Sequence, residues 1–121
     1  MSNDSIMSNI RIYHNPRCSK SRETLALLQE QGIEPEVVEY LKDTPTALEL
    51  KKILTKLNLK PTDILRRGEQ IYKDRFRNMN FSDEEWIDIM VENPKLIERP
   101  IVLKGNTGII GRPPENVIKL L

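Results

Sequence analysis

The first forty residues alternate between short apolar runs and an amphipathic stretch, a pattern that predicts a β-α-β unit. Residues 10–14 (IRIYH) are β-prone and stop at an Asn-Pro pair. Leucines share one face of residues 19–31 if that segment is helical, and a glycine follows it. Residues 36–40 (EVVEY) form the second predicted strand, and a crossover of this kind favours parallel neighbours.

Helical patterns fill the middle of the chain. Thr46 and Glu49 have the spacing of a capping box and precede apolar residues at helical spacing. Ser82 and Glu85 repeat that spacing, so another helix is predicted after them. Between these two helices, a short helix is predicted over residues 61–68, from a proline to a glycine.

The end of the chain predicts a β-hairpin and a helix. β-Prone runs at residues 101–104 and 107–110 are separated by a Gly-Asn pair, and residues 114–121 begin with a proline suited to a first helical turn. The predicted order is β-α-β, a helical insert over about residues 44–97, then β-β-α. This order indicates an α/β fold with a mixed four-stranded sheet. No linker or repeat interrupts it, so residues 1–121 are interpreted as a single domain.

The composition excludes several classes of function. The chain has 121 residues, 19 lysines and arginines against 18 aspartates and glutamates, and a formal net charge of +1. This balance provides no sequence-wide attraction to nucleic acid, and no apolar run approaches the roughly 18 residues of a membrane span. Residues 1–9 lack the pattern of a secretory signal, and no metal-ligand spacing or glycine-rich phosphate loop is present. We expect a cytoplasmic monomer without a metal, a bound cofactor, or a nucleic-acid or membrane partner.

The only cysteine, Cys18, lies where the first predicted strand gives way to the first predicted helix. A lone cysteine cannot form an internal disulfide and indicates a reducing compartment. The free N–H groups of a helix start stabilise a thiolate. That effect is worth about 0.3–1 kcal/mol, and up to about 2 kcal/mol in good geometry. One pKa unit corresponds to about 1.36 kcal/mol, so the helix alone lowers the thiol pKa by roughly one unit. A buried structural cysteine is the alternative interpretation.

Three charged or titratable neighbours bear on this choice. His14, the only histidine, precedes Cys18 by four residues, and a protonated imidazole beside the sulfur favours the thiolate. Lys20 and Arg22 lie in the first helical turn, where acidic residues are the norm, and two cations there indicate a bound anion. The alternative is that both are solvated surface charges.

The spacing around Cys18 excludes two kinds of thiol enzyme. A cysteine phosphatase needs C-x5-R, whereas the residue six positions after the cysteine is Thr24. A dithiol oxidoreductase needs C-x-x-C, whereas position 21 is Ser21. The motif that remains is C-x-x-S.

Four segments of the chain resemble those of a known protein family. The segment YHNPRCSKSRETLALL resembles the start of the glutaredoxin-coupled arsenate reductase family, and the likeness continues in family order through ILRRGEQIY, ENPKLIERPIV and GRPPENV. The resemblance covers nearly all of the chain after residue 10 and implies a thioredoxin-like fold with a helical insert. The best-known members follow the cysteine with Gly-Thr-Ser-Arg, whereas this chain has Ser-Lys-Ser-Arg and looks like a sister branch.

The resemblance also implies a site. Cys18 corresponds to the nucleophile, and His14 to the histidine thought to lower its pKa. Three arginines correspond to ligands of the oxyanion, namely Arg66, Arg99 and Arg112. A cis proline corresponds to Pro100, which with Lys20 and Arg22 is assigned to glutathione or anion binding.

Guanidinium groups suit a tetrahedral oxyanion because they can donate two parallel hydrogen bonds. Arg99 and Arg112 each precede a proline, which holds the preceding residue extended. A surface ion pair is the alternative for any one of these arginines. Arg66 is adjacent to Arg67, and only the resemblance selects Arg66.

The implied reaction is the reduction of arsenate, or a similar oxyanion, through the Cys18 thiolate. Glutathione acts as co-substrate and glutaredoxin as partner, which fits a chain without a second cysteine. One alternative is a glutathione-dependent thiol oxidoreductase with another substrate, in which Lys20 contacts glutathione. Another is a non-enzymatic regulator that binds RNA polymerase. The related branch of such regulators commonly uses C-x-x-C as a redox switch, and this chain lacks the switch because position 21 is Ser21.

Overall fold

The computed structural model describes residues 9–121, and the chain forms two compact units. The first unit comprises Met1–Asp43 and Arg99–Leu121, and the second comprises Thr44–Glu98. The interpretation of the chain as a single domain stays a prediction. The expected absence of a secretory signal concerns residues 1–9, and all but the last of these lie outside the described residues.

The first unit is built on a four-stranded mixed sheet. Its strands are β1 (Ile10–His14), β2 (Glu36–Glu39), β3 (Ile101–Lys104) and β4 (Thr107–Ile110), in the order β2-β1-β3-β4. β1 is parallel to β2 and antiparallel to β3, which is antiparallel to β4. The predicted sheet is therefore confirmed, with the parallel pair joined by a helical crossover as expected.

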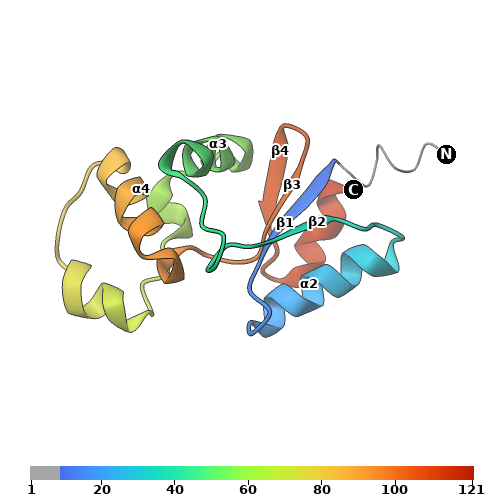
Figure 1. Cartoon of the computed structure of the whole chain (residues 1–121), viewed down its shortest axis with the longest axis horizontal. Helices are drawn as coiled ribbons and strands as arrows, with labels where there is room; N and C mark the ends of the chain where they lie inside the picture. The colour runs from blue at the N-terminus through green and yellow to red at the C-terminus, as the bar shows by residue number, and fades with distance from the viewer. Residues whose placement is uncertain (1–8) are drawn as a thin grey trace. The chain divides into compact units, whose positions relative to one another are not determined.

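Two helices cover one face of this sheet (Figure 1). They are α2 (Ser19–Glu30) and the C-terminal 3₁₀ helix η4 (Pro114–Leu120). Ile12 of β1 lies opposite Val102 of β3, and both are completely buried. Alternate strand positions thus face one core, whose buried members are Ile10, Ile12, Leu28, Ile33, Val102 and Val117. The last predicted helix is present, but it has 3₁₀ geometry and ends one residue earlier.

The predicted hairpin joins β3 to β4 through a two-residue turn. Gly105 adopts a φ of 59°, in the left-handed region that glycine enters without steric cost. Lys104 pairs with Thr107 on either side of the turn, and Thr107 Oγ1 donates to the Lys104 carbonyl at 2.9 Å. The hairpin prediction is therefore confirmed by a turn with glycine in its first position.

The second unit is helical, and two capping boxes define its principal helices, α3 (Ala47–Leu57) and α4 (Asp83–Glu92). Glu49 N–H donates to Thr46 Oγ1 at 3.1 Å, and the Glu49 carboxylate accepts from the Thr46 N–H at 2.8 Å. The pair of Ser82 and Glu85 repeats both bonds with the same distances. Both predicted helix starts are therefore confirmed.

The short helix predicted over residues 61–68 is only partly correct. It is a 3₁₀ helix, η1 (Pro61–Ile64), because Leu65 leaves it in an extended conformation and pairs antiparallel with Ile97. The Arg66 N–H donates to the Leu96 carbonyl at 2.8 Å, and the Glu98 N–H donates to the Ile64 carbonyl at 2.8 Å. This bridge supplies the backbone hydrogen bonds that a longer helix would have made.

Two further short helices were not predicted. A π-helical turn, η2 (Tyr72–Phe76), precedes α4, and a 3₁₀ turn, η3 (Pro94–Leu96), follows it. The η2 turn is anchored by aromatic packing, with the Phe76 and Trp86 ring centroids 6.3 Å apart. Such packing depends on tertiary contacts, so no local periodicity announces this turn.

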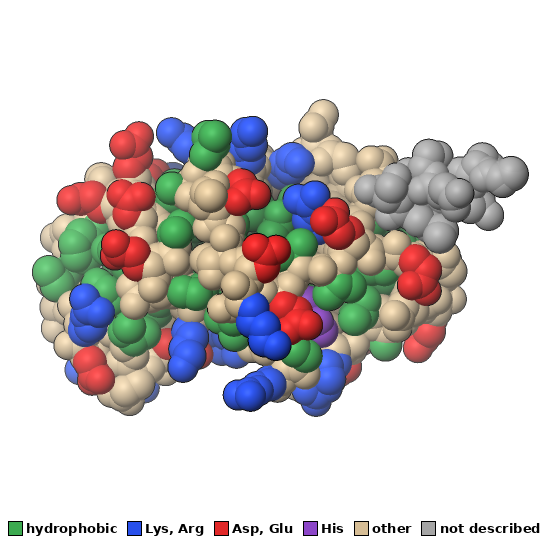
Figure 2. Space-filling model, in the orientation of Figure 1, with side chains coloured by type: hydrophobic (Ala, Val, Ile, Leu, Met, Phe, Trp, Pro, Cys, Tyr) green, Lys and Arg blue, Asp and Glu red, His purple; other side chains and the backbone are tan. Residues whose placement is uncertain are grey.

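The surface carries both signs of charge. Figure 2 shows acidic and basic side chains interspersed over the face that it draws, in keeping with a net charge of +1. Any anion site must therefore depend on the local placement of a few cations. Over residues 9–121, no helix combines the length and apolar character needed to cross a membrane.

Candidate active site

Cys18 is the residue that caps the start of α2. Its backbone is extended, with φ −95° and ψ 122°, and its side chain makes no capping hydrogen bond. The Cys18 N–H donates to the Asn15 carbonyl at 3.0 Å, which closes the turn after β1, and the Cys18 carbonyl accepts from the Arg22 N–H at 3.0 Å. The residue is only partly buried, which does not fit the alternative of a cysteine filling the core.

The surroundings of the sulfur favour its ionised form. Burial raises the pKa of the Cys18 thiol, but the backbone N–H of Ser21 and the Arg99 guanidinium lower it by more, and the Lys20 N–H adds to them. The first turn of α2 contains no acidic residue to oppose an anion. The pKa of the thiol therefore lies below its ordinary value, as expected for a nucleophile at a helix start.

Arg99 and Arg112 both reach this thiol from the far end of the chain. Arg112 Nη1 lies 3.7 Å from Cys18 Sγ and also donates to the Arg99 carbonyl at 3.1 Å. The Arg99 guanidinium hydrogen-bonds to the same sulfur. Each arginine precedes a cis proline, Pro100 or Pro113. The structure thus brings two of the three predicted oxyanion ligands to the nucleophile, with Pro100 in the cis form that the resemblance implied.

Arg66 belongs to the second unit and has carboxylate partners there. Its Nε lies 3.3 Å from Glu69 Oε2, and its Nη1 lies 2.5 Å from Glu98 Oε1. This is the ion-pair alternative stated for the arginines. The role of Arg66 in binding an oxyanion stays a prediction, and the neighbouring Arg67 donates to the Thr62 carbonyl at 3.3 Å.

His14 contacts Ser21. The buried imidazole places Nδ1 2.6 Å from Ser21 Oγ, which also accepts from the Asn15 N–H at 3.0 Å. Burial lowers the pKa of His14, Glu39 acts in the opposite direction, and Arg22 lowers it further. Together these causes favour the neutral form of the ring. The imidazole thus contacts Ser21, whose backbone N–H faces the thiol, and the role of His14 in lowering the pKa of Cys18 stays a prediction.

Lys20 and Arg22 differ in what they do. The Lys20 backbone N–H faces the thiol, and its side chain is partly buried. Arg22 is exposed, and its Nη1 donates to the Pro16 carbonyl at 3.0 Å, which braces the turn that carries Cys18. Binding of glutathione or an anion by either side chain stays a prediction.

Sequence analysis missed two polar residues of the site, Ser21 and Thr24, and used them only to exclude motifs. Both are completely buried on the face of α2 that also carries Leu28. Polar residues at core-facing positions of an amphipathic helix are costly unless they are hydrogen-bonded. Their positions, seven and four residues before the core residue Leu28, were the available signal.

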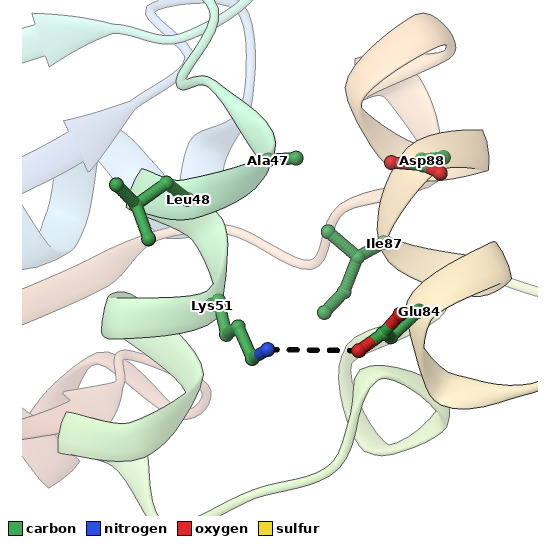
Figure 3. A pocket seen from close by; sticks show the side chains of 6 residues that line it. All are labelled: Ala47, Leu48, Lys51, Glu84, Ile87 and Asp88. Carbon is green, nitrogen blue, oxygen red and sulfur yellow. Dashed lines mark ion pairs between the residues drawn. The ribbon is translucent and has the colours of Figure 1, made fainter.

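A separate pocket of about 290 Å³ lies between α3 and α4 of the second unit (Figure 3). Ala47, Leu48 and Ile87 supply its apolar lining. Lys51 points across it to Glu84, with 3.7 Å between Nζ and Oε1, and a further acid, Asp88, stands nearby (Figure 3). A lining with two carboxylates and one paired cation does not suit an oxyanion, so the candidate site remains at Cys18. Within residues 9–121, no group of three or more His, Cys, Asp or Glu side chains could hold a metal ion.

Comparison with known proteins agrees with this site and fold. The model of the ArsC family matches residues 13–120. The chain is 47% identical over 114 residues to the uncharacterized protein YfgD of Escherichia coli, which covers 93% of this chain and 96% of that protein. It is 43% identical over 115 residues to an arsenate reductase of Haemophilus influenzae, which covers 93% and 99%. The solved structure of an arsenate reductase from Vibrio cholerae matches with a TM-score of 0.90 at 47% identity, over 95% of this chain and 98% of that one. With a thiol at a helix start, two arginines beside it and a match along nearly its whole length, the chain belongs to the ArsC family and has its thioredoxin-like fold.

Proposed function

We propose that the protein reduces arsenate to arsenite, with the Cys18 thiolate as nucleophile. The observation that carries this proposal is the meeting of Arg99 and Arg112 at a thiol of lowered pKa, in a chain of the ArsC family. A thiolate supplies the nucleophile, and guanidinium groups neutralise the charge of a tetrahedral oxyanion and orient its oxygens. Relatives named arsenate reductase are similar in sequence to this chain over nearly its whole length.

The proposed reaction begins when the Cys18 thiolate attacks As(V) and forms an S–As bond, with loss of one oxygen as water or hydroxide. The thiol of glutathione then displaces a second oxygen, and arsenic carries two sulfur ligands. A glutaredoxin thiolate attacks the glutathione sulfur, and a glutaredoxin–glutathione disulfide forms. The electron pair of the broken S–As bond stays on arsenic, which becomes As(III). Water releases arsenite and restores the Cys18 thiol.

The external thiols are part of the proposal because the chain has a single cysteine. Reduction of As(V) to As(III) takes two electrons, and one thiol cannot provide both by forming an internal disulfide. Reduced glutathione and a free Cys18 also require a reducing compartment such as the cytoplasm.

A second candidate is a glutathione-dependent reaction on a different substrate. It is favoured by Ser19-Lys20, where the best-known arsenate reductases have Gly-Thr, directly after the nucleophile. The added ammonium suits a carboxylate of glutathione as well as an oxyanion. In this version the Cys18 thiolate attacks a disulfide between glutathione and a substrate, takes the glutathione as a mixed disulfide and releases the substrate thiol, and arsenate is not turned over.

Arsenite production by the purified protein tests the first candidate. We expect turnover with arsenate, glutathione, glutaredoxin and NADPH with its reductase, and none with thioredoxin as the only thiol source. Cys18→Ser should abolish turnover and leave the circular dichroism spectrum unchanged. Sustained turnover with thioredoxin alone would contradict the proposed use of external glutathione. A Cys18–glutathione adduct in intact mass spectra, without arsenite production, would favour the second candidate.

A further inference from the structure

Three segments of the first unit meet at a buried junction behind Cys18. Thr24, on the inner face of α2, is completely buried. Its Oγ1 donates to the Lys20 carbonyl at 2.8 Å and lies 3.2 Å from the Gly111 carbonyl, a shared hydrogen bond that links α2 to the residue after β4. The Gly111 N–H donates to the Pro100 carbonyl at 2.9 Å, which ties in the third segment.

The junction leaves no space for a side chain at position 111. A Cβ on Gly111 would lie 2.6 Å from Thr24 Oγ1, 2.9 Å from Thr24 Cγ2 and 2.9 Å from Pro100 Cγ. All three distances are shorter than real Cβ contacts, and the atoms belong to buried residues that have little room to move. Thr24 and Gly111 therefore fit one another in shape as well as through a hydrogen bond.

Both arginines of the candidate site are sequence neighbours of residues in this junction. Arg112 follows Gly111, and Arg99 precedes Pro100. Arg112 Nη1 joins the two segments again by its bond to the Arg99 carbonyl, and the same nitrogen lies 3.7 Å from Cys18 Sγ. A shift of the Gly111 backbone away from α2 would carry the start of the Arg112 side chain with it.

We propose that Thr24 and Gly111 are positioning residues, whose contact holds Arg112 against the Cys18 thiolate. In a phosphatase with the C-x5-R motif, the arginine is the sixth residue after the cysteine, which is the position of Thr24 here. In this chain Thr24 instead binds the segment that carries Arg112. The relevance of this contact to oxyanion binding rests on the proposed function. The placement of Arg112 beside the sulfur is independent of the proposed function.

Alkylation of Cys18 by two reagents measures that placement. Iodoacetate is an anion and iodoacetamide is neutral, so the ratio of their rates reports the positive charge beside the sulfur. The thiolate fraction cancels in the ratio, and no arsenate is needed. A unit charge about 4 Å away in water changes a rate by a factor of about five, so we expect Thr24→Val to lower the ratio about two- to threefold.

Two variants control for the loss of a threonine hydroxyl. Thr55 Oγ1 also donates to a carbonyl four residues earlier, that of Lys51 at 3.0 Å, but on the exposed side of α3. Thr55→Val should therefore leave the ratio unchanged. Thr24→Ser keeps the hydroxyl and should restore the wild-type ratio, which a defect of packing alone would not predict.

Gly111→Ala tests the junction from its other side, and it also serves if Thr24→Val does not fold. The new Cβ should displace the segment and lower the ratio. Replacing Thr24 by alanine in the same protein removes two of the three atoms in its way, so the double variant Thr24→Ala/Gly111→Ala should recover part of the loss. If the ratio of the double variant is no higher than that of Gly111→Ala, the proposed fit between Thr24 and Gly111 is wrong.

The decisive comparison uses Arg112→Gln. If Thr24 acts through Arg112, Thr24→Val has no further effect on the ratio in the Arg112→Gln background. A folded Thr24→Val protein with the wild-type ratio, or an equal fall in both backgrounds, overturns the proposal. Where arsenate is turned over, KM should rise more than kcat falls in Thr24→Val. If arsenate is not turned over by the wild type, the proposed function fails, and the alkylation ratios still decide the role of Thr24.

Discussion

Ser21 connects the only histidine to the only cysteine. Its hydroxyl contacts His14 Nδ1 at 2.6 Å and accepts from the Asn15 N–H at 3.0 Å, while its backbone N–H stabilises the Cys18 thiolate. With the Asn15 N–H on its oxygen, the hydroxyl can donate its proton to the ring, which fits a neutral imidazole. At the scale of single residues, His14 therefore contacts the turn whose backbone N–H groups face the sulfur, and an effect of the ring on the thiol through Ser21 is a prediction.

His14→Asn separates this indirect role from a direct effect of charge. Asparagine has no charge and places its amide near the position of Nδ1, so it can keep a hydrogen bond to Ser21. We expect the thiol pKa, measured from the pH dependence of iodoacetamide alkylation, to stay close to that of the wild type. In both proteins the rate should level off at a lower pH than for an ordinary thiol of pKa about 8.5.

His14→Ala is the contrasting variant. It removes the partner of Ser21 and should raise the thiol pKa. An equal rise in His14→Asn and His14→Ala would show that the charge of an imidazolium matters, against the geometry of this turn.

At the scale of elements, the helices of the second unit depend on local capping. The Ser82 hydroxyl accepts from the Glu85 N–H at 3.1 Å at the start of α4. Just before it, the Phe81 ring packs edge-on against Trp86, with 5.0 Å between centroids. The cap thus lies next to the single tryptophan of the chain, which reports on the start of this helix.

Ser82→Ala should weaken α4. Loss of a serine cap costs about 1 kcal/mol, because an N–H at the helix start loses its acceptor. Urea unfolding followed by the fluorescence of Trp86 should show a lower midpoint with an unchanged slope. Ser82→Thr keeps the acceptor oxygen and should lie near the wild type. A midpoint unaffected by Ser82→Ala would mean that this cap contributes nothing to stability.

At the scale of the whole molecule, an oxyanion that binds only the folded chain stabilises that chain against unfolding. Arg112 lies 94 positions after the cysteine that it contacts, so this site exists only once the sheet has assembled. Thermal unfolding in the presence of arsenate, phosphate or sulfate therefore reports on the complete site.

Arg99→Lys should reduce this stabilisation. Lysine keeps the charge but cannot donate two parallel hydrogen bonds to an oxyanion. We expect the rise in melting temperature with added arsenate to be smaller than in the wild type. Arg67→Lys is the matched control, because Arg67 is exposed and donates to the Thr62 carbonyl. If arsenate stabilises both variants equally, Arg99 does not belong to the anion site.

The elements that could be predicted are those that depend on short-range interactions. The capping boxes at Thr46 and Ser82 use partners three residues apart, and the hairpin turn at Gly105 uses one residue in the left-handed region. The position of Cys18 at the start of α2 follows in the same way from a strand, a turn and a helix in succession. The premature end of η1 at Ile64 was not predictable, because Ile97 supplies the bridge that ends it.

The sequence by itself determined the order of the strands and the principal helices, the single thiol and its place at a helix start, since each is set by neighbours along the chain. Only the tertiary structure decided which side chains meet that thiol. It brought Arg99 and Arg112 to Cys18, and it brought Glu98 to Arg66. The physical reason is that long side chains take their partners from the register of the sheet and the packing of buried helices, and these form only when distant segments come together.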